Sequence, residues 1–114
     1  MSPTIADRSR VKSQIEGNVI QTVSRTLKEE LKFSRSAVTS LDWAGYPILT
    51  FPEVPDIVIE LIDHPTEKPW GAGEPTAAVV PSAISNAVFD ATGVRLRSVP
   101  FTAEKVREAQ RRGA

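Results

Sequence analysis

Glu74 is the residue of this chain whose neighbours best suit contact with a ligand. It lies in residues 71–75, Gly-Ala-Gly-Glu-Pro, between an alternating apolar run and a helical run. Glycine tolerates backbone angles and close approaches that other residues do not, and Pro75 suits the first turn of a helix. A carboxylate held there can contact a ligand without its own backbone in the way. The alternative is an ordinary turn into a helix, with Glu74 favoured only by the helix dipole.

A second polar cluster lies near the start of a helix that we expect over residues 10–33. Apolar residues recur there every four positions, which indicates one buried face: Val11, Ile15, Val19, Val23, Leu27 and Leu31, widened by Ile20. Gly17 interrupts this helix at a cost of up to about 1 kcal/mol, and an interior glycine often marks close packing or ligand approach. The cluster consists of Gln14, Glu16, Gly17 and Gln21. Its alternative interpretation is a solvated face with a packing glycine.

Composition excludes several classes of protein. The chain has 114 residues, of which 40% are hydrophobic, enough for one small domain with a modest core. Basic and acidic residues balance at 14 each, which argues against a nucleic-acid or anionic-membrane partner. The chain contains no cysteine, so a disulfide framework, a zinc–thiolate site and an iron–sulfur cluster are excluded within it.

The remaining bulk features concern location and metals. No run of residues is long and apolar enough for a membrane span, and residues 1–10 show no signal-peptide core. We therefore expect a cytoplasmic or periplasmic location. The single histidine, His64, has no neighbouring ligands, so we expect no metal site made by this chain.

The order of the remaining elements favours an α+β fold, a small sheet packed by helices. A flexible arm is expected over residues 1–9 and one domain over 10–112. The clearest strand is residues 56–63, where Ile57, Ile59 and Leu61 alternate with a mixed face. Shorter strands are expected at 37–39 and 94–99. Helices are expected over 76–92, broken at Pro81 and ended by Gly93, and over 103–111, capped by Thr102.

Three segments together resemble the C-terminal end of the molybdenum-cofactor subunit of the xanthine dehydrogenase and aldehyde oxidase family. Bacterial members that act on isoquinoline, nicotinate or aldehydes look most similar, and the likeness extends over roughly residues 7 to 110. The segments are residues 14–17 (Gln-Ile-Glu-Gly) with Gln21, residues 71–75 and residues 81–95, followed by a matching tail at 99–106. One short motif would be weak, but three in the family's order are specific.

The resemblance implies a molybdenum hydroxylase, an oxidoreductase that hydroxylates an aldehyde or an N-heterocycle with oxygen from water. Glu74 matches the family's catalytic glutamate, the general base that accepts a proton from the attacking oxygen. Such a base must be ionised, close to the reacting group and shielded from bulk water. Gln14 matches a glutamine that contacts the pterin, Gly73 a backbone position beside molybdenum, and Gly17 a further cofactor-binding position.

Two departures from the family limit what this chain can do alone. Many relatives have glycine at the positions of Asn18 and Thr22, so packing on the pterin side is expected to differ. The family's subunit is also much longer and supplies most of its cofactor-binding loops from segments absent here. We therefore expect the molybdenum–pterin cofactor only in the complete enzyme, none on the isolated chain. The expected partners are the remaining molybdenum-subunit segments and an iron–sulfur subunit.

Two other interpretations stay open at this point. The chain could be a non-catalytic remnant of the family that self-associates through the apolar surface its missing neighbours would cover, giving a homo-oligomer. It could instead be a small protein-binding module in which Glu74 only favours the start of a helix.

Overall fold

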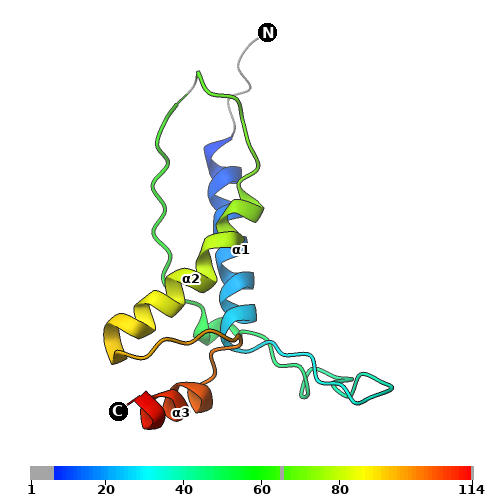
Figure 1. Ribbon diagram of the computed structural model, residues 1–114. Coiled ribbons are helices and arrows are strands. Elements are labelled where there is room, and N and C mark those ends of the chain that lie inside the picture. The colour runs from blue at the N-terminus through cyan, green and yellow to red at the C-terminus, as the bar shows by residue number, and fades with distance from the viewer. Residues whose placement is uncertain (1–6, 65, 114) are drawn as a thin grey trace.

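The computed structural model describes residues 7–64 and 66–113, and within them the chain is mostly helical. Its elements, in chain order, are α1 (Arg8–Leu27), the 3-10 turn η1 (Phe51–Glu53), α2 (Gly73–Thr92) and α3 (Ala103–Gly113). α1 and α2 pack against each other along the centre of the molecule, and α3 lies at the end opposite the start of α1 (Figure 1). The expected arm falls mainly on residues 1–6, which lie outside the described residues, since Asp7 caps α1.

The predicted α+β fold with a small sheet is wrong. The described residues contain no strand, and their only ladder-type pairing is an isolated antiparallel bridge between Phe33 and Val38. Residues 56–63 do run extended, but no second described segment pairs with them; residues 37–39 contribute only the bridge at Val38, and residues 94–99 form no strand (Figure 1). Alternating side chains indicate an extended backbone, whereas a sheet also requires a neighbouring strand to accept its hydrogen bonds.

α1 begins at Arg8, two residues before the predicted start, and ends earlier than predicted. The carboxylate of Asp7 accepts hydrogen bonds from the backbone N–H groups of Ser9 (2.9 Å) and Arg10 (3.4 Å), so Asp7 caps the helix. The helix was expected to reach residue 33 but stops at Leu27. Leu31 and Phe33 are exposed, so no packing supports further turns beyond that point.

α2 is one continuous helix from Gly73 to Thr92, with Pro81 inside it. The predicted break at Pro81 is therefore wrong. An interior proline removes one helical hydrogen bond and costs about 3 kcal/mol, and the packing of α2 along α1 offsets that cost. Gly93 ends the helix with φ at 78°, a left-handed conformation that glycine adopts without strain, as predicted.

The buried core is small and sits near the C-terminal end of α1. Its apolar members are Val23, Leu96 and Phe101. Hydrogen bonds complete it, because the N–H of Phe101 donates to the carbonyl of Thr26 at 2.6 Å. Ser85 on α2 donates to the carbonyl of Leu96 at 2.9 Å. The residues after α2 are thus hydrogen-bonded to both long helices.

α3 begins where the sequence predicts. Thr102 caps it, since the hydroxyl of Thr102 accepts from the N–H of Lys105 at 3.3 Å. Glu104 lies in its first turn, and Arg111 and Arg112 lie in its last, as the helix dipole favours.

The molecule is elongated and leaves much apolar surface uncovered. Its radius of gyration is 17.8 Å, against about 13 Å for a compact domain of about 100 residues. Large exposed hydrophobic side chains occur along most of its length, among them Leu41, Trp43, Phe51, Val58, Ile62 and Trp70. Across the described ranges, no helix is long and apolar enough to cross a membrane.

Candidate functional site

The candidate site forms where the start of α2 meets the N-terminal half of α1. Gly73 is the first residue of α2, and a Cβ placed on it would lie 2.9 Å from Nδ2 of Asn18 and 3.5 Å from Oε1 of Gln14. Real Cβ atoms essentially never come as close as 2.9 Å to another heavy atom. Glycine at position 73 therefore lets the two helices approach at this point.

Asn18 is held in place at this contact. Its amide Nδ2 donates a hydrogen bond of 2.8 Å to the main-chain carbonyl of Gln14, one helical turn earlier. Gln14 and Asn18 are four residues apart and so share one face of α1. The sequence placed Gln14 and Gly73 in one site, and the structure brings these two residues together.

Asn18 is the member of this cluster that the sequence analysis did not include among its site residues. It was noted only as a departure from the family's glycine. The signal that could have found it is its spacing of four from Gln14, which sets both amide side chains on the same helical face.

Glu74 follows Gly73 in the first turn of α2 and is exposed. The N-cap of this helix, Ala72, provides no side-chain hydrogen bond, so the first N–H groups of α2 are not capped by a side chain. No hydrogen bond or ion pair with another described residue engages the Glu74 carboxylate.

Gly17 lies on α1 with open space beside it. A Cβ built there meets no heavy atom within 4 Å, and the residue is exposed. The structure does not bring Gly17 against α2, so glycine is not required there by packing within this chain. Its expected role toward a cofactor stays a prediction.

A broad hollow of about 1350 Å³ lies between α3, the end of α1 and residues 93–95, and its lining includes neither Gln14 nor Glu74. Within residues 7–64 and 66–113, no three His, Cys, Asp or Glu side chains gather closely enough to hold a metal ion.

Two ionisable side chains, Glu53 and Tyr46, connect the segment after α1 to residues just beyond the end of that helix. Glu53 forms an ion pair with Lys28 and also accepts hydrogen bonds from the N–H and hydroxyl of Thr50, both at 2.7 Å. The bond from Lys28, followed by those from Thr50, lowers the pKa of Glu53 from 4.5 to about 2. The hydroxyl of Tyr46 donates to Glu29 at 2.9 Å, and that bond raises the pKa of Tyr46.

Comparison with known proteins places the chain among its relatives. No family model matches it. The chain is 52% identical over 99 residues to a subunit of nicotinate dehydrogenase from Pseudomonas putida, a match that covers 87% of this chain. It is 30% identical over 109 residues to the molybdenum-binding subunit of an aldehyde oxidoreductase from Escherichia coli, covering 90% of this chain. The chain is a homologue of the molybdenum subunits of the xanthine dehydrogenase and aldehyde oxidase family.

A solved structure extends this family relationship to the fold. The crystal structure of quinoline 2-oxidoreductase from Pseudomonas putida 86 matches 96% of this chain with a TM-score of 0.82 and 27% sequence identity. The open helical arrangement described above therefore recurs within an enzyme of known structure. The resemblance found in the residues is confirmed.

The homologous region is a small share of these molybdenum-subunit relatives. The chain spans 8% of the length of the nicotinate dehydrogenase subunit, 15% of the aldehyde oxidoreductase subunit and 15% of the quinoline 2-oxidoreductase chain. Several of these homologues are named as subunits, so they belong to assemblies of more than one chain.

Proposed function

We propose that this chain supplies the general-base segment of a molybdenum hydroxylase and acts when joined to the rest of the molybdenum subunit. The observation that carries the proposal is the packing of Gly73 against Gln14 and Asn18. This packing holds the start of α2 fixed against α1. Glu74, the next residue, then leaves the contact in a defined direction with its carboxylate unengaged by the described residues.

The polar groups at this contact fit the edge of a pterin cofactor. The amide of Gln14 can both donate and accept hydrogen bonds, and the first N–H groups of α2 can donate to an oxygen. The open space beside Gly17 leaves room for a planar group against α1. Gln14, Gly17 and Gly73 would hold one side of the cofactor, which when bound supplies the redox chemistry.

Glu74 would act on the proton that is lost as the substrate is hydroxylated. A carboxylate accepts a proton efficiently when it is held within hydrogen-bond reach of the proton it removes. Because Glu74 is exposed in this chain, other segments would have to cover it and exclude water.

The exposed apolar side chains support assembly with further protein over a role as a stand-alone module. Trp43, Phe51 and Trp70 are all largely exposed, and burying aromatic side chains stabilises interfaces strongly. The coverage of 8–15% of each relative supports the same interpretation, because those proteins have the chain length to cover this surface.

The proposal is tested by complementation. The nicotinate dehydrogenase subunit of Pseudomonas putida would be expressed without the 99 residues that match this chain, alone or together with this chain and with the other subunits of that enzyme. We expect this chain to copurify and to restore bound molybdenum and nicotinate turnover. Copurification without molybdenum would contradict the cofactor role, and absence of copurification would contradict the proposal as a whole.

A further inference from the structure

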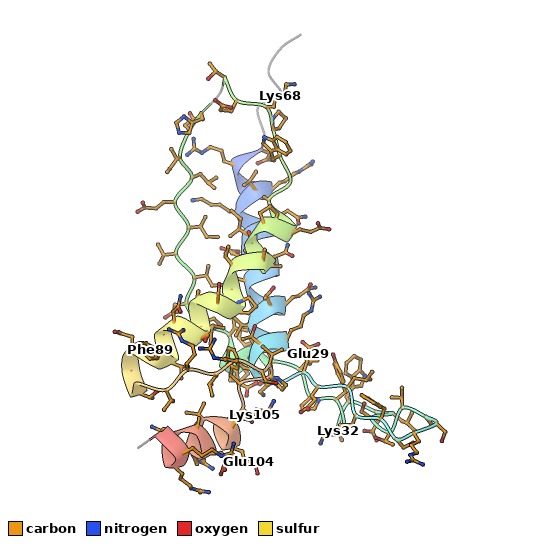
Figure 2. The ribbon with its side chains drawn as sticks, in the orientation of Figure 1. Glu29, Lys32, Lys68, Phe89, Glu104 and Lys105 are labelled. Atoms are coloured by element: carbon orange, nitrogen blue, oxygen red, sulfur yellow. The ribbon has the colours of Figure 1, made fainter. Side chains whose placement is uncertain are left out.

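Residues 56–63 form an extended segment that lies beside the helices without a strand partner. The segment leads from η1 to the loop before α2, and its side chains project alternately to opposite sides (Figure 2). Ile57, Ile59 and Leu61 are half-buried, while the residues between them face solvent. Val58 and Ile62 on the solvent side are 89% and 82% exposed. The segment thus has the side-chain pattern of a strand that is covered on one face only.

The main-chain N–H and C=O groups of this segment make almost no hydrogen bonds with the described residues. Among the described residues, its one hydrogen bond joins Nη2 of Arg8 to the carbonyl of Leu61 at 3.3 Å. In an extended chain, the N–H and C=O of one residue point to the same edge. Arg8 therefore contacts the edge formed by Ile57, Ile59 and Leu61, and the groups of Val58, Glu60 and Ile62 form a second, open edge. Unpaired edge groups are a template for another strand.

The charge on the segment restricts which strand can bind there. Residues 53–63 contain four acidic side chains and no basic one. Two of the four are neutralised from α1, since Lys28 pairs with Glu53 and Arg8 lies 3.7 Å from Asp63. Asp56 and Glu60 have no ion-pair partner among the described residues, and they alternate with Val58 and Ile62 on the exposed face. That face therefore reads acidic, apolar, acidic, apolar.

We propose that the open edge of residues 56–62 binds an extended strand from the remaining part of the molybdenum subunit. On the exposed face, that strand presents lysine or arginine opposite Asp56 and Glu60 and apolar, β-branched residues opposite Val58 and Ile62. Opposite charges and apolar residues directly across from each other are the pairs that stabilise neighbouring strands. The inference rests on the proposed function, since it takes the partner from the same enzyme.

A second copy of this chain fits this edge poorly. Parallel pairing in register would set Asp56 and Glu60 each against itself, and antiparallel pairing centred on Val58 would set Asp56 against Glu60. Like charges directly opposite each other are destabilising. The relatives offer another source of a strand, because the fold seen here accounts for only 15% of the quinoline 2-oxidoreductase chain.

The test uses this chain copurified with the Pseudomonas putida nicotinate dehydrogenase subunit that lacks its matching 99 residues. Residue-resolved amide exchange is compared between the isolated chain and the complex. We expect the N–H groups of Val58, Glu60 and Ile62 to become protected in the complex, with little change at Ile59. Alternation of protection along the segment is specific to strand pairing, since simple burial would protect consecutive residues together.

Two pairs of variants separate charge from main-chain pairing. Glu60→Lys should lower recovery of the complex about tenfold, while Glu67→Lys, the same change in the exposed loop that follows, should leave recovery within about twofold. Glu60→Pro should lower recovery about tenfold below Glu60→Ala, because both lose the carboxylate and only proline lacks the N–H. The isolated chain uses neither group in a hydrogen bond between described residues, so all four variants should melt like the parent.

The outcomes distinguish this inference from the proposed function. Normal recovery of the Glu60 variants, with exchange at Val58, Glu60 and Ile62 unchanged in the complex, would overturn the strand pairing and leave the proposed function standing. Failure of the parent chain to copurify would overturn both. Sedimentation showing a dimer of the isolated chain, with the same three amides protected, would assign the edge to a second copy and overturn the partner named here.

Discussion

A Cβ on Gly73 would lie 2.9 Å from Nδ2 of Asn18, so α2 meets α1 at these two residues of the candidate site. We expect Gly73→Ala to lower the free energy of unfolding by about 1 kcal/mol. Overpacking costs about 1–3 kcal/mol, and the better helix propensity of alanine returns up to about 1 kcal/mol. Urea unfolding of the isolated chain measures the change.

A second variant shows whether the contact is the cause. In an Asn18→Ala background the clash is absent, so Gly73→Ala should become neutral or stabilising there. An equal loss of stability in both backgrounds would mean that Gly73 is required for a reason other than its approach to Asn18.

Replacing Gly17 by alanine should stabilise the isolated chain, the opposite of the effect expected at Gly73. Nothing lies within 4 Å of a Cβ built on it, and it sits inside α1. Gly17→Ala should therefore raise the free energy of unfolding of the isolated chain by up to about 1 kcal/mol. In the complemented enzyme the added methyl group should lower the molybdenum content. Greater stability with full molybdenum content would remove Gly17 from the cofactor-binding residues.

The ion pair between Lys28 and Glu53 predicts a pH dependence of stability. The pKa of Glu53 falls from 4.5 to about 2 on folding, chiefly because of the hydrogen bond from Lys28. A carboxyl group with a lowered folded-state pKa stabilises the fold above its unfolded pKa, and this contribution is lost as the pH falls. The melting temperature should therefore decline between about pH 4.5 and pH 2.

Glu53→Gln should remove that part of the decline, because glutamine does not titrate. Glu67→Gln, a change of the same kind in an exposed loop, serves as the control and should leave the profile as in the parent. If the melting temperature of both variants declines as steeply as the parent's between pH 4.5 and 2, the ion pair of Glu53 with Lys28 does not stabilise the fold.

Local signals in the sequence predicted two helix ends, the start of α3 and the end of α2. Thr102 and Gly93 act where they were expected, since each depends on one side chain or one backbone angle beside its own helix. The alternation in residues 56–63 also agrees with their burial, since Ile57, Ile59 and Leu61 are half-buried and the residues between them are exposed. What failed was the sheet, because alternation carries no information about whether a partner strand exists in the same chain.

Non-local packing accounts for the other differences. Pro81 was expected to break α2, and the helix continues because α1 packs along it. For the candidate site, the sequence predicted Gln14, Gly73 and Glu74 through their motifs. It did not predict the contribution of Asn18, because that contact depends on how closely α1 and α2 approach.

The most direct measurement is nicotinate turnover per molybdenum in the complemented enzyme, with Glu74→Gln in this chain and Glu104→Gln as the matched control. Both glutamates lie in the first turn of a helix, so each change should alter stability by only about 0.3–1 kcal/mol. Glutamine keeps the shape of glutamate but cannot accept the proton. We predict that Glu74→Gln lowers turnover about 10²- to 10⁴-fold at unchanged molybdenum content, while Glu104→Gln has no effect. Turnover per molybdenum equal to the parent's in Glu74→Gln would contradict the assignment of Glu74 as the general base.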